Sequence, residues 1–454
     1  MVSAQTVYDA RVSANMPTFV VLDDDPTGTQ SVAGLPVITY WDPDDMRWAL
    51  GTGAPAIYVM TNTRSMTPED AEKVNAEVVR TAKVVAEELD MAVAFVSRSD
   101  STLRGHFPLE PDTITQIGGP VDGVLVIPAF PDAGRVTVDG VHFCTDANGE
   151  LIPVGESEYA KDHSFGYHAS NLSEWIEEKT NGRVLAHDVL HITAAELDDR
   201  DAVVEKLAGV ADGQYVIADI QSEEDLRKLA LGVIGAYQAG KTFIHRVGPP
   251  YVRALIGMDE PEIITSEQID ELIPHGDTPY GLVVVGSHVP TTTRQLNALT
   301  GSLRAAVVEL DVPQLLENAE PVIAGAVEVL VTALDSCTAV IHTSRDVIAG
   351  KDEAESLAIA RTVNGALVET IRRVIERKPP RFVIAKGGIT SSDVAKFSLH
   401  MHRAMVIGPM EPGIISVWLA QDGPGTAIPY VVFAGNVGSE QSLANAVSVL
   451  SKEA

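Results

Sequence analysis

The stretch Ser97-Arg98-Ser99-Asp100-Ser101-Thr102-Leu103-Arg104-Gly105-His106 directly follows an apolar run, residues 91–96. An apolar run of this length between polar residues is typical of a buried strand in an α/β sheet. We therefore expect Arg98, Asp100 and Arg104 just past the carboxyl end of that strand, where ligands bind in open α/β sheets. Because a guanidinium can hold a carboxylate or phosphate at two points, the stretch predicts a site for a small polyhydroxylated anion. The alternative is that Asp100 or Ser101 caps the next helix and the arginines are solvated.

Length, composition and charge restrict the class of protein. A chain of 454 residues exceeds a single core, and 45% apolar with 21% charged residues is typical of a well-packed globular protein. The net charge of −30 argues against binding to nucleic acid or to an anionic membrane, since both need a basic surface. The two cysteines, Cys144 and Cys337, form neither a disulfide framework nor a metal-ligand spacing.

The sequence also carries expectations about location and partners. Residues 1–16 lack the apolar core of a signal peptide, and no apolar run approaches membrane-spanning length. We expect a cytoplasmic protein whose partners are small molecules, with neither nucleic acid nor membrane among them; a homo-oligomer is left open.

Three adjacent carboxylates, Asp23, Asp24 and Asp25, follow the apolar strand predicted over residues 18–22. Neighbouring carboxylates repel one another, which costs stability unless a cation or a hydroxyl ligand is held there. The alternative is a simple turn, because the Pro-Thr-Gly sequence that comes next is typical of turns. Their place at the end of a strand favours a functional role.

Two further loops with arginines belong to the same pattern. A strand at 56–60 ends in a polar loop with Arg64, and a strand at 121–130 ends in one with Arg135. Between them, Thr67 followed by proline and acids predicts the start of a helix that runs to about residue 89. Polar loops after several strands of alternating strand and helix units predict one ligand site at one edge of a parallel sheet.

The rest of the first half continues the alternation up to a break. Residues 156–167 are interpreted as a loop that covers the site, followed by strands at 184–192, 214–220 and 242–247 and by helices at 194–209 and 222–239. Residues 257–279 then interrupt the pattern with prolines, glycines and acids. We predict an N-terminal domain at 1–257, a linker at 258–279 and a C-terminal domain at 280–454.

The second half contains three strands that each end in a turn rich in glycine, serine or threonine, at 281–285, 381–385 and 430–433. Strand, glycine turn and helix start together expose unpaired amides, which favour a phosphate. None of the turns matches the P-loop or the dinucleotide-binding glycine pattern. The candidate nucleotide-binding residues are Ser287, Lys386, Gly387, Gly388, Thr390, Gly435, Asn436 and Gly438.

The motif Asp100-Ser-Thr-Leu-Arg-Gly105, together with Asp-Asp-x-Thr-Gly near the N-terminus and Lys386-Gly-Gly388, resembles the four-carbon acid-sugar kinase family. The resemblance implies two α/β domains with mostly parallel sheets, an active site in the cleft between them, and ATP and Mg²⁺ as cofactors. Applied to this chain, the resemblance implies that the acid is contacted by Asp24, Arg64, Asp100 and Arg104. Asp25 and Arg98 complete the predicted substrate-binding set.

Two positions depart from the family pattern. Pro26 and Thr29 stand where better-known members have leucine and alanine. Ala434 stands where many members carry a lysine, which removes one expected cation near the phosphates.

The predicted function is ATP-dependent phosphorylation of a hydroxyl on a small sugar acid. A carboxylate takes the proton of the acceptor hydroxyl; the candidates are Asp24 and Asp100, and Asp100 is favoured because flanking arginines keep it ionised. The rival functions are a sugar-acid dehydrogenase or dehydratase and a non-catalytic sensor of a sugar acid and a nucleotide. The absence of a strand–Gly-x-Gly-x-x-Gly–helix unit disfavours the dehydrogenase.

Overall fold

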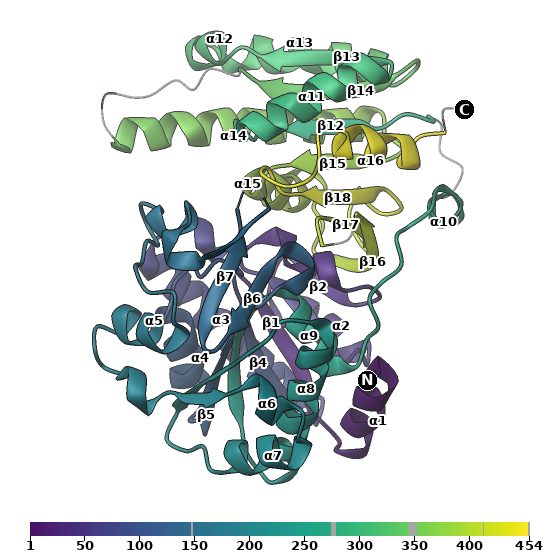
Figure 1. Ribbon diagram of the computed structural model, residues 1–454. Coiled ribbons are helices and arrows are strands. Elements are labelled where there is room, and N and C mark those ends of the chain that lie inside the picture. The colour runs from purple at the N-terminus through teal and green to yellow at the C-terminus, as the bar shows by residue number, and fades with distance from the viewer. Residues whose placement is uncertain (147–148, 274–277, 345–350, 352, 412, 453–454) are drawn as a thin grey trace. The chain divides into compact units, whose positions relative to one another are not determined.

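The computed structural model describes the chain except for residues 147–148, 274–277, 345–350, 352, 412 and 453–454 (Figure 1). The chain splits into two compact units, Met1–Pro261 and Glu262–Ala454. This division falls inside the predicted linker, residues 258–279, whose limits stay a prediction.

A parallel sheet forms the centre of the first unit, with the strand order β2-β3-β1-β4-β11-β5-β10-β9. Strands β1, β3, β5 and β11 are buried along their whole length, as expected when helices cover both faces of a parallel sheet. The strands are β1 (Thr18–Asp23), β2 (Pro36–Ile38), β3 (Ala56–Met60), β4 (Val93–Arg98), β5 (Gly123–Ile127), β9 (Leu190–Ile192), β10 (Gln214–Ala218) and β11 (Phe243–Val247).

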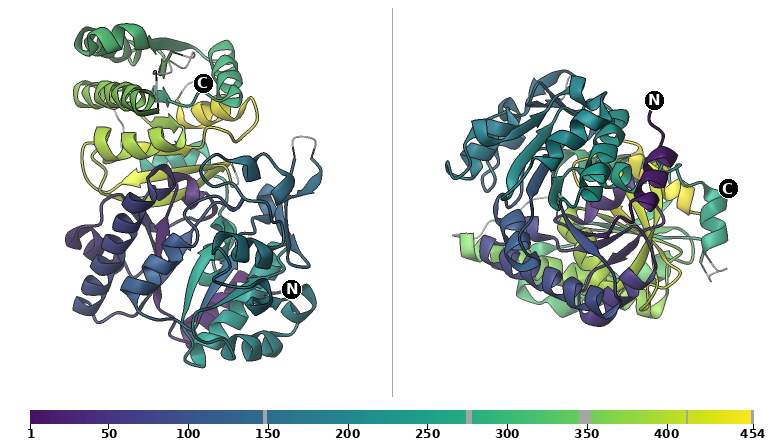
Figure 2. Two further views of the ribbon diagram at one scale, coloured as in Figure 1. Left: turned by 90° about the vertical axis from the view of Figure 1, so that its left-hand side faces the viewer. Right: turned by 90° about the horizontal axis from the view of Figure 1, so that it is seen from below.

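The helices of this unit pack in two groups. Helix α3 contacts both α2 and α4, and α1 and α6 to α9 form the second group; Figure 2 shows one group along each face of the sheet. The helices are α1 (Ala4–Ser13), α2 (Pro43–Gly51), α3 (Pro68–Glu88), α4 (Leu109–Gly118), α5 (Leu172–Lys179), α6 (Ala194–Leu197), α7 (Arg200–Ala208), α8 (Glu223–Gln238) and α9 (Pro249–Ile256). One core cluster joins strand residues such as Val20 and Val59 to helix residues such as Val78 and Val85.

The predicted helix start at Thr67 is confirmed. The Thr67 hydroxyl accepts a hydrogen bond from the backbone N–H of Asp70, and α3 begins at Pro68. The side chains of Ala71, Val78 and Val85 on this helix are fully buried, which is the helical spacing of a core-facing stripe.

Three details of this unit differ from the sequence prediction. Of the strand predicted at 184–192, only β9 is extended, because the chain forms turns up to residue 188. The helix predicted at 194–209 is divided in two, because the Asp199 carboxylate accepts from the backbone N–H groups of Asp201 and Ala202 and caps a new helix. Moreover, Arg135 was predicted in a loop but begins β6 (Arg135–Val138), which forms a small antiparallel sheet with β7 (Val141–Thr145) and β8 (Leu151–Pro153).

The second unit has a mixed sheet with the order β13-β14-β12-β15-β18-β17-β16. Along this order, the strands from β13 to β18 pair in parallel. Strand β17 pairs antiparallel with both β18 and β16, and the sequence did not predict these antiparallel strands. The strands are β12 (Leu282–Val285), β13 (Ala305–Leu310), β14 (Thr338–Thr343), β15 (Val383–Lys386), β16 (Arg403–Glu411), β17 (Ile415–Ala420) and β18 (Pro429–Phe433).

The helices of the second unit are α10 (Ser266–Leu272), α11 (Pro290–Ser302), α12 (Val312–Glu317), α13 (Ala319–Ala333), α14 (Glu353–Arg377), α15 (Gly388–Asp393) and α16 (Ser442–Leu450). Helix α10 lies within the residues predicted as a linker, and its Ile269 packs in the core of this unit with Val283 and Val431. Among the helices described in either unit, none has the length and apolar composition needed to cross a membrane.

Candidate functional site

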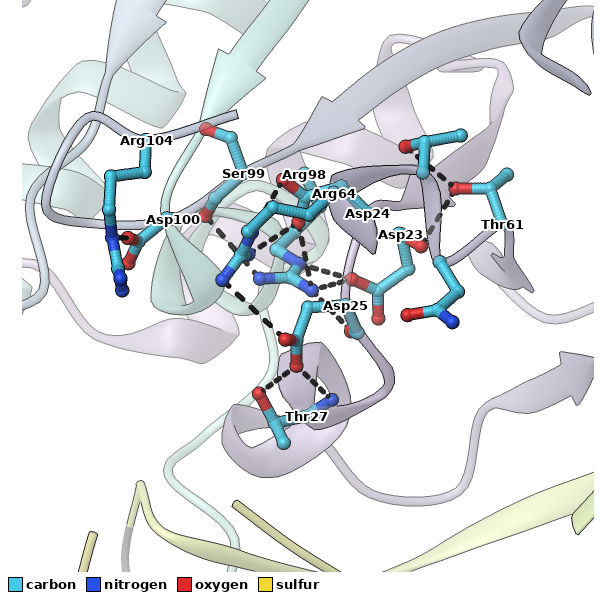
Figure 3. A network of polar contacts seen from close by, with 12 residues as sticks. Asp23, Asp24, Asp25, Thr27, Thr61, Arg64, Arg98, Ser99, Asp100 and Arg104 are labelled. Carbon is cyan, nitrogen blue, oxygen red and sulfur yellow. Dashed lines mark hydrogen bonds and ion pairs between the residues drawn. The ribbon is translucent and has the colours of Figure 1, made fainter. Parts of the chain in front are cut away.

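Three neighbouring strands of the first unit carry the predicted acid-binding residues at one edge of the sheet. In the sheet order β3-β1-β4, Arg64 follows β3, Asp24 follows β1, and Asp100 and Arg104 follow β4 (Figure 3). Because the three strands are parallel, their carboxyl ends meet at the same edge. The loops that the sequence placed together therefore lie together.

Asp24 and Arg64 form a two-point ion pair. The Arg64 Nη2 lies 2.6 Å from Asp24 Oδ1, and its Nε lies 3.1 Å from Oδ2. The same guanidinium lies 3.5 Å from the Asp25 carboxylate. Charge-assisted pairs of this kind are strong and directional, so Arg64 fixes the Asp24 carboxylate from the neighbouring strand.

A further arginine, Arg98, is buried beside the three consecutive aspartates, residues 23–25. It pairs with Asp23, which lies opposite it in the parallel register, and its Nη2 is 3.3 Å from Asp24 Oδ1. Burial raises the pKa of Asp23 to about 7, and the Arg98 charge opposes that rise. The repulsion predicted among the three aspartates is therefore offset by arginines of the chain itself.

Asp100 accepts three hydrogen bonds from its own loop, one of them from the Thr102 hydroxyl. The Arg104 Nε lies 2.7 Å from Asp100 Oδ2, and the backbone N–H of Thr102 donates to Oδ1 at 3.2 Å. Burial alone would raise the pKa of Asp100, but the guanidiniums of Arg64 and Arg104 hold it well below its usual range. The lowered pKa predicted for Asp100 is confirmed. The two guanidiniums that lower it are those of Arg64 and Arg104, whereas Arg98 and Arg104 were predicted.

The Asp100 loop is anchored by side chains from other segments. Tyr167 donates its hydroxyl to the carbonyl of Thr102 at 2.7 Å, and His142 Nε2 lies 2.8 Å from the Ser101 carbonyl. Burial lowers the pKa of His142 to about 4, so its ring is neutral and donates from Nε2 at neutral pH. Leu103 has a φ of +67°, a conformation that costs energy for a side chain with a Cβ and is typical of functional loops.

The segment predicted to cover the site does contact this loop. Arg104 lies 5.1 Å from the centroid of the Tyr159 ring and 3.6 Å from the Asp162 carboxylate. The exposed fraction of the arginine side chains then separates their roles, with 24% for Arg104, 18% for Arg64 and 3% for Arg98. Arg64 and Arg104 are the cations that a ligand can reach, and Arg98 is placed to hold the aspartates.

In the second unit, adjacent parallel strands β12, β15 and β18 end in the three glycine turns. The carbonyl of Lys386 accepts from the backbone N–H groups of Gly286 and Ser287 at 3.2 and 3.3 Å. The Thr292 hydroxyl lies 3.1 Å from Ser287 Oγ and donates to the Gly435 carbonyl at 2.7 Å. The turns predicted as parts of one site are therefore joined to one another.

Two of these glycines stand where a side chain would not fit. Gly387 has a φ of +124°, which side chains with a Cβ rarely adopt. A Cβ on Gly435 would lie 2.5 Å from Ser287 Oγ. Gly388 begins α15, which has only six residues, whereas α11 after the Ser287 turn has thirteen.

Other predicted residues of this site differ in exposure. Thr390 is buried, and its hydroxyl lies next to Gly286 and Gly387. Asn436 is exposed on the third turn, which also holds Gly438 with a φ of +85°.

Lys386 is fully buried beneath these turns. Its Nζ donates to the carbonyl of Ala434 at 2.6 Å and lies 3.6 Å from the centroid of the Phe433 ring. Burial lowers the pKa of Lys386 to about 7. The ammonium of Lys386 therefore reaches the turn in which Ala434 replaces the expected lysine, but it is turned away from solvent.

Sequence reasoning missed two residues beneath the first site, Glu110 and Arg246. They form a buried ion pair, and a hydrogen bond joins Arg246 to Ser97 on β4. An arginine inside the strand predicted at 242–247 was a usable signal, because a charge in a buried strand needs a partner. No comparable signal marked Glu110 as that partner.

Comparison with known proteins agrees with this arrangement. The sequence matches the family of sugar-binding N-terminal domains over residues 19–255 and the family of nucleotide-binding C-terminal domains over residues 282–443. A D-erythronate kinase of Heliobacterium modesticaldum is 26% identical over 322 residues. The match covers 68% of this chain and 66% of that relative, just under two thirds of its length.

Two solved structures share the fold. A Salmonella typhimurium LT2 protein, provisionally described as a tRNA synthase, has a TM-score of 0.69 at 18% identity, over 94% of this chain and 98% of its own. Haemophilus influenzae protein HI1011 has a TM-score of 0.61 at 19% identity, over 95% of this chain and 100% of its own. With both domain families matched in order along nearly the whole chain, this protein belongs to the four-carbon acid sugar kinase family.

Proposed function

We propose that this protein transfers a phosphoryl group from ATP to a hydroxyl of a small sugar acid, with a four-carbon acid as the first candidate. One observation carries the proposal. A chain with a sugar-binding and a nucleotide-binding domain has, on the first, reachable arginines beside fixed carboxylates at the carboxyl edge of a parallel sheet.

The chemistry of the first edge suits an acid with several hydroxyls. Arg104 and Arg64 offer partly exposed guanidiniums for a carboxylate, while Asp24 and Asp100 offer acceptors for hydroxyl protons. Because the pKa of Asp100 is held low, this group is ionised at neutral pH and can accept a hydrogen bond from a substrate hydroxyl.

The second edge suits the phosphates of a nucleotide. A side chain at Gly387 or Gly435 would crowd Ser287, so these glycines let the backbone of the turns approach closely, and α11 begins just beyond the Ser287 turn. Phosphoryl transfer needs the donor phosphate and the acceptor hydroxyl in line, so the proposal requires the two edges to face each other during turnover.

Mg²⁺ stays a prediction, and we assign no residue to it. Each aspartate of the first edge already faces an arginine: Asp23 faces Arg98, Asp24 and Asp25 face Arg64, and Asp100 faces Arg104. A metal that neutralises ATP phosphates would then arrive with the nucleotide.

The test is a coupled assay of ADP release with Mg-ATP and a panel of four- to six-carbon sugar acids. We expect one acid to give turnover, and that acid at a hundred times its dissociation constant should stabilise the protein by about 2.7 kcal/mol. Stabilisation by an acid and by ATP without ADP release would instead indicate a non-catalytic sensor. Turnover that depends on a nicotinamide cofactor would indicate a dehydrogenase.

A further inference from the structure

Glu110, on α4, joins three segments that lead into the acid-binding edge. Its Oε1 accepts a hydrogen bond from the Thr63 hydroxyl at 2.6 Å. Its Oε2 accepts from the Ser97 hydroxyl at 3.3 Å and pairs with Arg246. The carboxylate is buried, so all of these interactions lie out of water.

Each partner of Glu110 is a neighbour of the site. Thr63 directly precedes Arg64, and Ser97 directly precedes Arg98. Arg246 belongs to β11, the strand next to β4, and its Nη1 also donates to Ser97 Oγ at 2.8 Å. One carboxylate therefore ties together the ends of β3, β4 and β11.

Arg246 extends this network to the site itself. A Cβ on Gly105 would lie 2.9 Å from Arg246 Nη2 and 3.0 Å from Asp24 Oδ2. The guanidinium and the Asp24 carboxylate thus both approach the Gly105 backbone, where φ is +113° and no side chain intervenes. The network starts at Glu110 and ends beside a predicted substrate contact.

We propose that Glu110 is a positioning residue of the acid site: through Thr63, Ser97 and Arg246 it sets the loops that carry Arg64, Asp24 and the Asp100–Arg104 pair. The expected change in KM rests on the proposed function, whereas the expected change in the loops does not. A buried carboxylate that merely filled the core would not need to join three loop-bearing strands.

The test compares Glu110→Gln with a matched control, Asp122→Asn, in the full chain. Asp122 lies before β5, at the opposite edge of the same sheet, and accepts from Lys241 Nζ at 3.1 Å and from the Thr242 backbone N–H at 2.9 Å. Both changes remove a carboxylate charge from a multiply bonded group and keep its size. Thr63→Val is a milder second variant, since it removes one hydrogen bond to Glu110 and leaves the charge.

We expect Glu110→Gln to lower kcat/KM for the sugar acid by about 10- to 100-fold, mainly through KM for the acid, with KM for ATP unchanged. Thr63→Val should shift KM in the same direction by less, and Asp122→Asn should leave it unchanged. Equal changes of KM for acid and ATP in Glu110→Gln, or equal effects in Asp122→Asn, would overturn the inference.

Backbone hydrogen exchange provides a readout that does not depend on turnover. In Glu110→Gln, amides of residues 62–66 and 99–105 should exchange faster than in wild type, while in Asp122→Asn they should not. Wild-type protein that turns over no sugar acid would contradict the proposed function. Unchanged exchange in these two loops would contradict the role of Glu110, whatever the substrate.

Discussion

The two candidate sites of this chain hold their ligand-facing groups by different means. At the edge of the first unit, charged side chains hold one another, as Arg64 holds Asp24 and Arg104 holds Asp100. At the edge of the second unit, backbone groups and small side chains hold the turns, and the buried ammonium of Lys386 donates to a carbonyl of the chain. The first edge offers fixed charges, and the second offers backbone atoms at closely packed glycine turns.

This difference predicts how each edge responds to mutation. Where charges hold one another, removal of one leaves another buried and unpaired, and the cost depends on the chemistry of the side chain. Where glycines allow a positive φ or close packing, any added Cβ is harmful whatever its chemistry. The comparison therefore separates a side-chain-sensitive acid site from a backbone-sensitive nucleotide site.

The largest effect is expected from removal of the general base at the first edge. Asp100→Asn should lower kcat by about 10²- to 10⁴-fold with a modest change in KM. Asp100 is favoured over Asp24 because its side chain is 13% exposed, against 2% for that of Asp24. Steady-state kinetics with a sugar-acid substrate is the measurement.

Asp24→Asn is the companion variant for this assignment. If Asp24→Asn loses turnover while Asp100→Asn keeps it, the two roles are reversed. If both keep near-normal turnover, the base is another residue and the first edge only binds.

The next effect concerns the most exposed arginine of the first edge. Arg104→Ala should weaken acid binding by about 10- to 150-fold, from loss of a charge-assisted interaction worth on the order of 1.5–3 kcal/mol. Binding of ATP should be unaffected, since Arg104 belongs to the other unit. Calorimetric titration with each ligand measures both, and equal losses would contradict the division of labour between the units.

The position of the acid site could be predicted from the sequence, but the ion pairs between its aspartates and arginines could not. Apolar runs followed by polar loops placed Asp24, Arg64 and Asp100 at the carboxyl ends of parallel strands, and such ends share an edge. The partner of each charge depends on strand register. Arg98 lies opposite Asp23 and is neutralised there, so Asp100 is left to Arg104 and Arg64.

Contacts between segments that lie far apart in the sequence were the other feature that could not be predicted. Arg246 comes beside β4 because β11 lies between β4 and β5, and a linear pattern does not reveal that strand order. The burial of Lys386 was missed for a similar reason, since its role follows from the neighbouring β18 turn. The short β6–β8 sheet lacked the strand length that makes alternation readable.

At the second edge, Gly387→Ala tests the sensitivity of the backbone. The new side chain must adopt a φ of +124°, which should cost about 1–3 kcal/mol and raise KM for ATP by about 5- to 150-fold. KM for the acid should not change. The matched control is Gly301→Ala on α11, where a Cβ meets nothing within 4 Å and alanine favours the helix. An equal rise in KM for ATP in both variants would contradict this role of Gly387.

The last effect concerns stability and not ligand binding, and is a pH dependence carried by Lys386. Because burial lowers its pKa to about 7 from 10.5, the folded chain binds fewer protons at this group than the unfolded chain between these two values. Stability contributed by this position therefore rises with pH across that window, by at most about 1.4 kcal/mol per pH unit. Lys386→Met removes the titration and keeps an apolar stem over the Phe433 ring. The melting temperature of wild type, measured relative to Lys386→Met, should accordingly increase from pH 7 to pH 9. A constant difference would mean that the ammonium stays charged in the folded chain and that the Ala434 carbonyl and the Phe433 ring compensate fully for its burial.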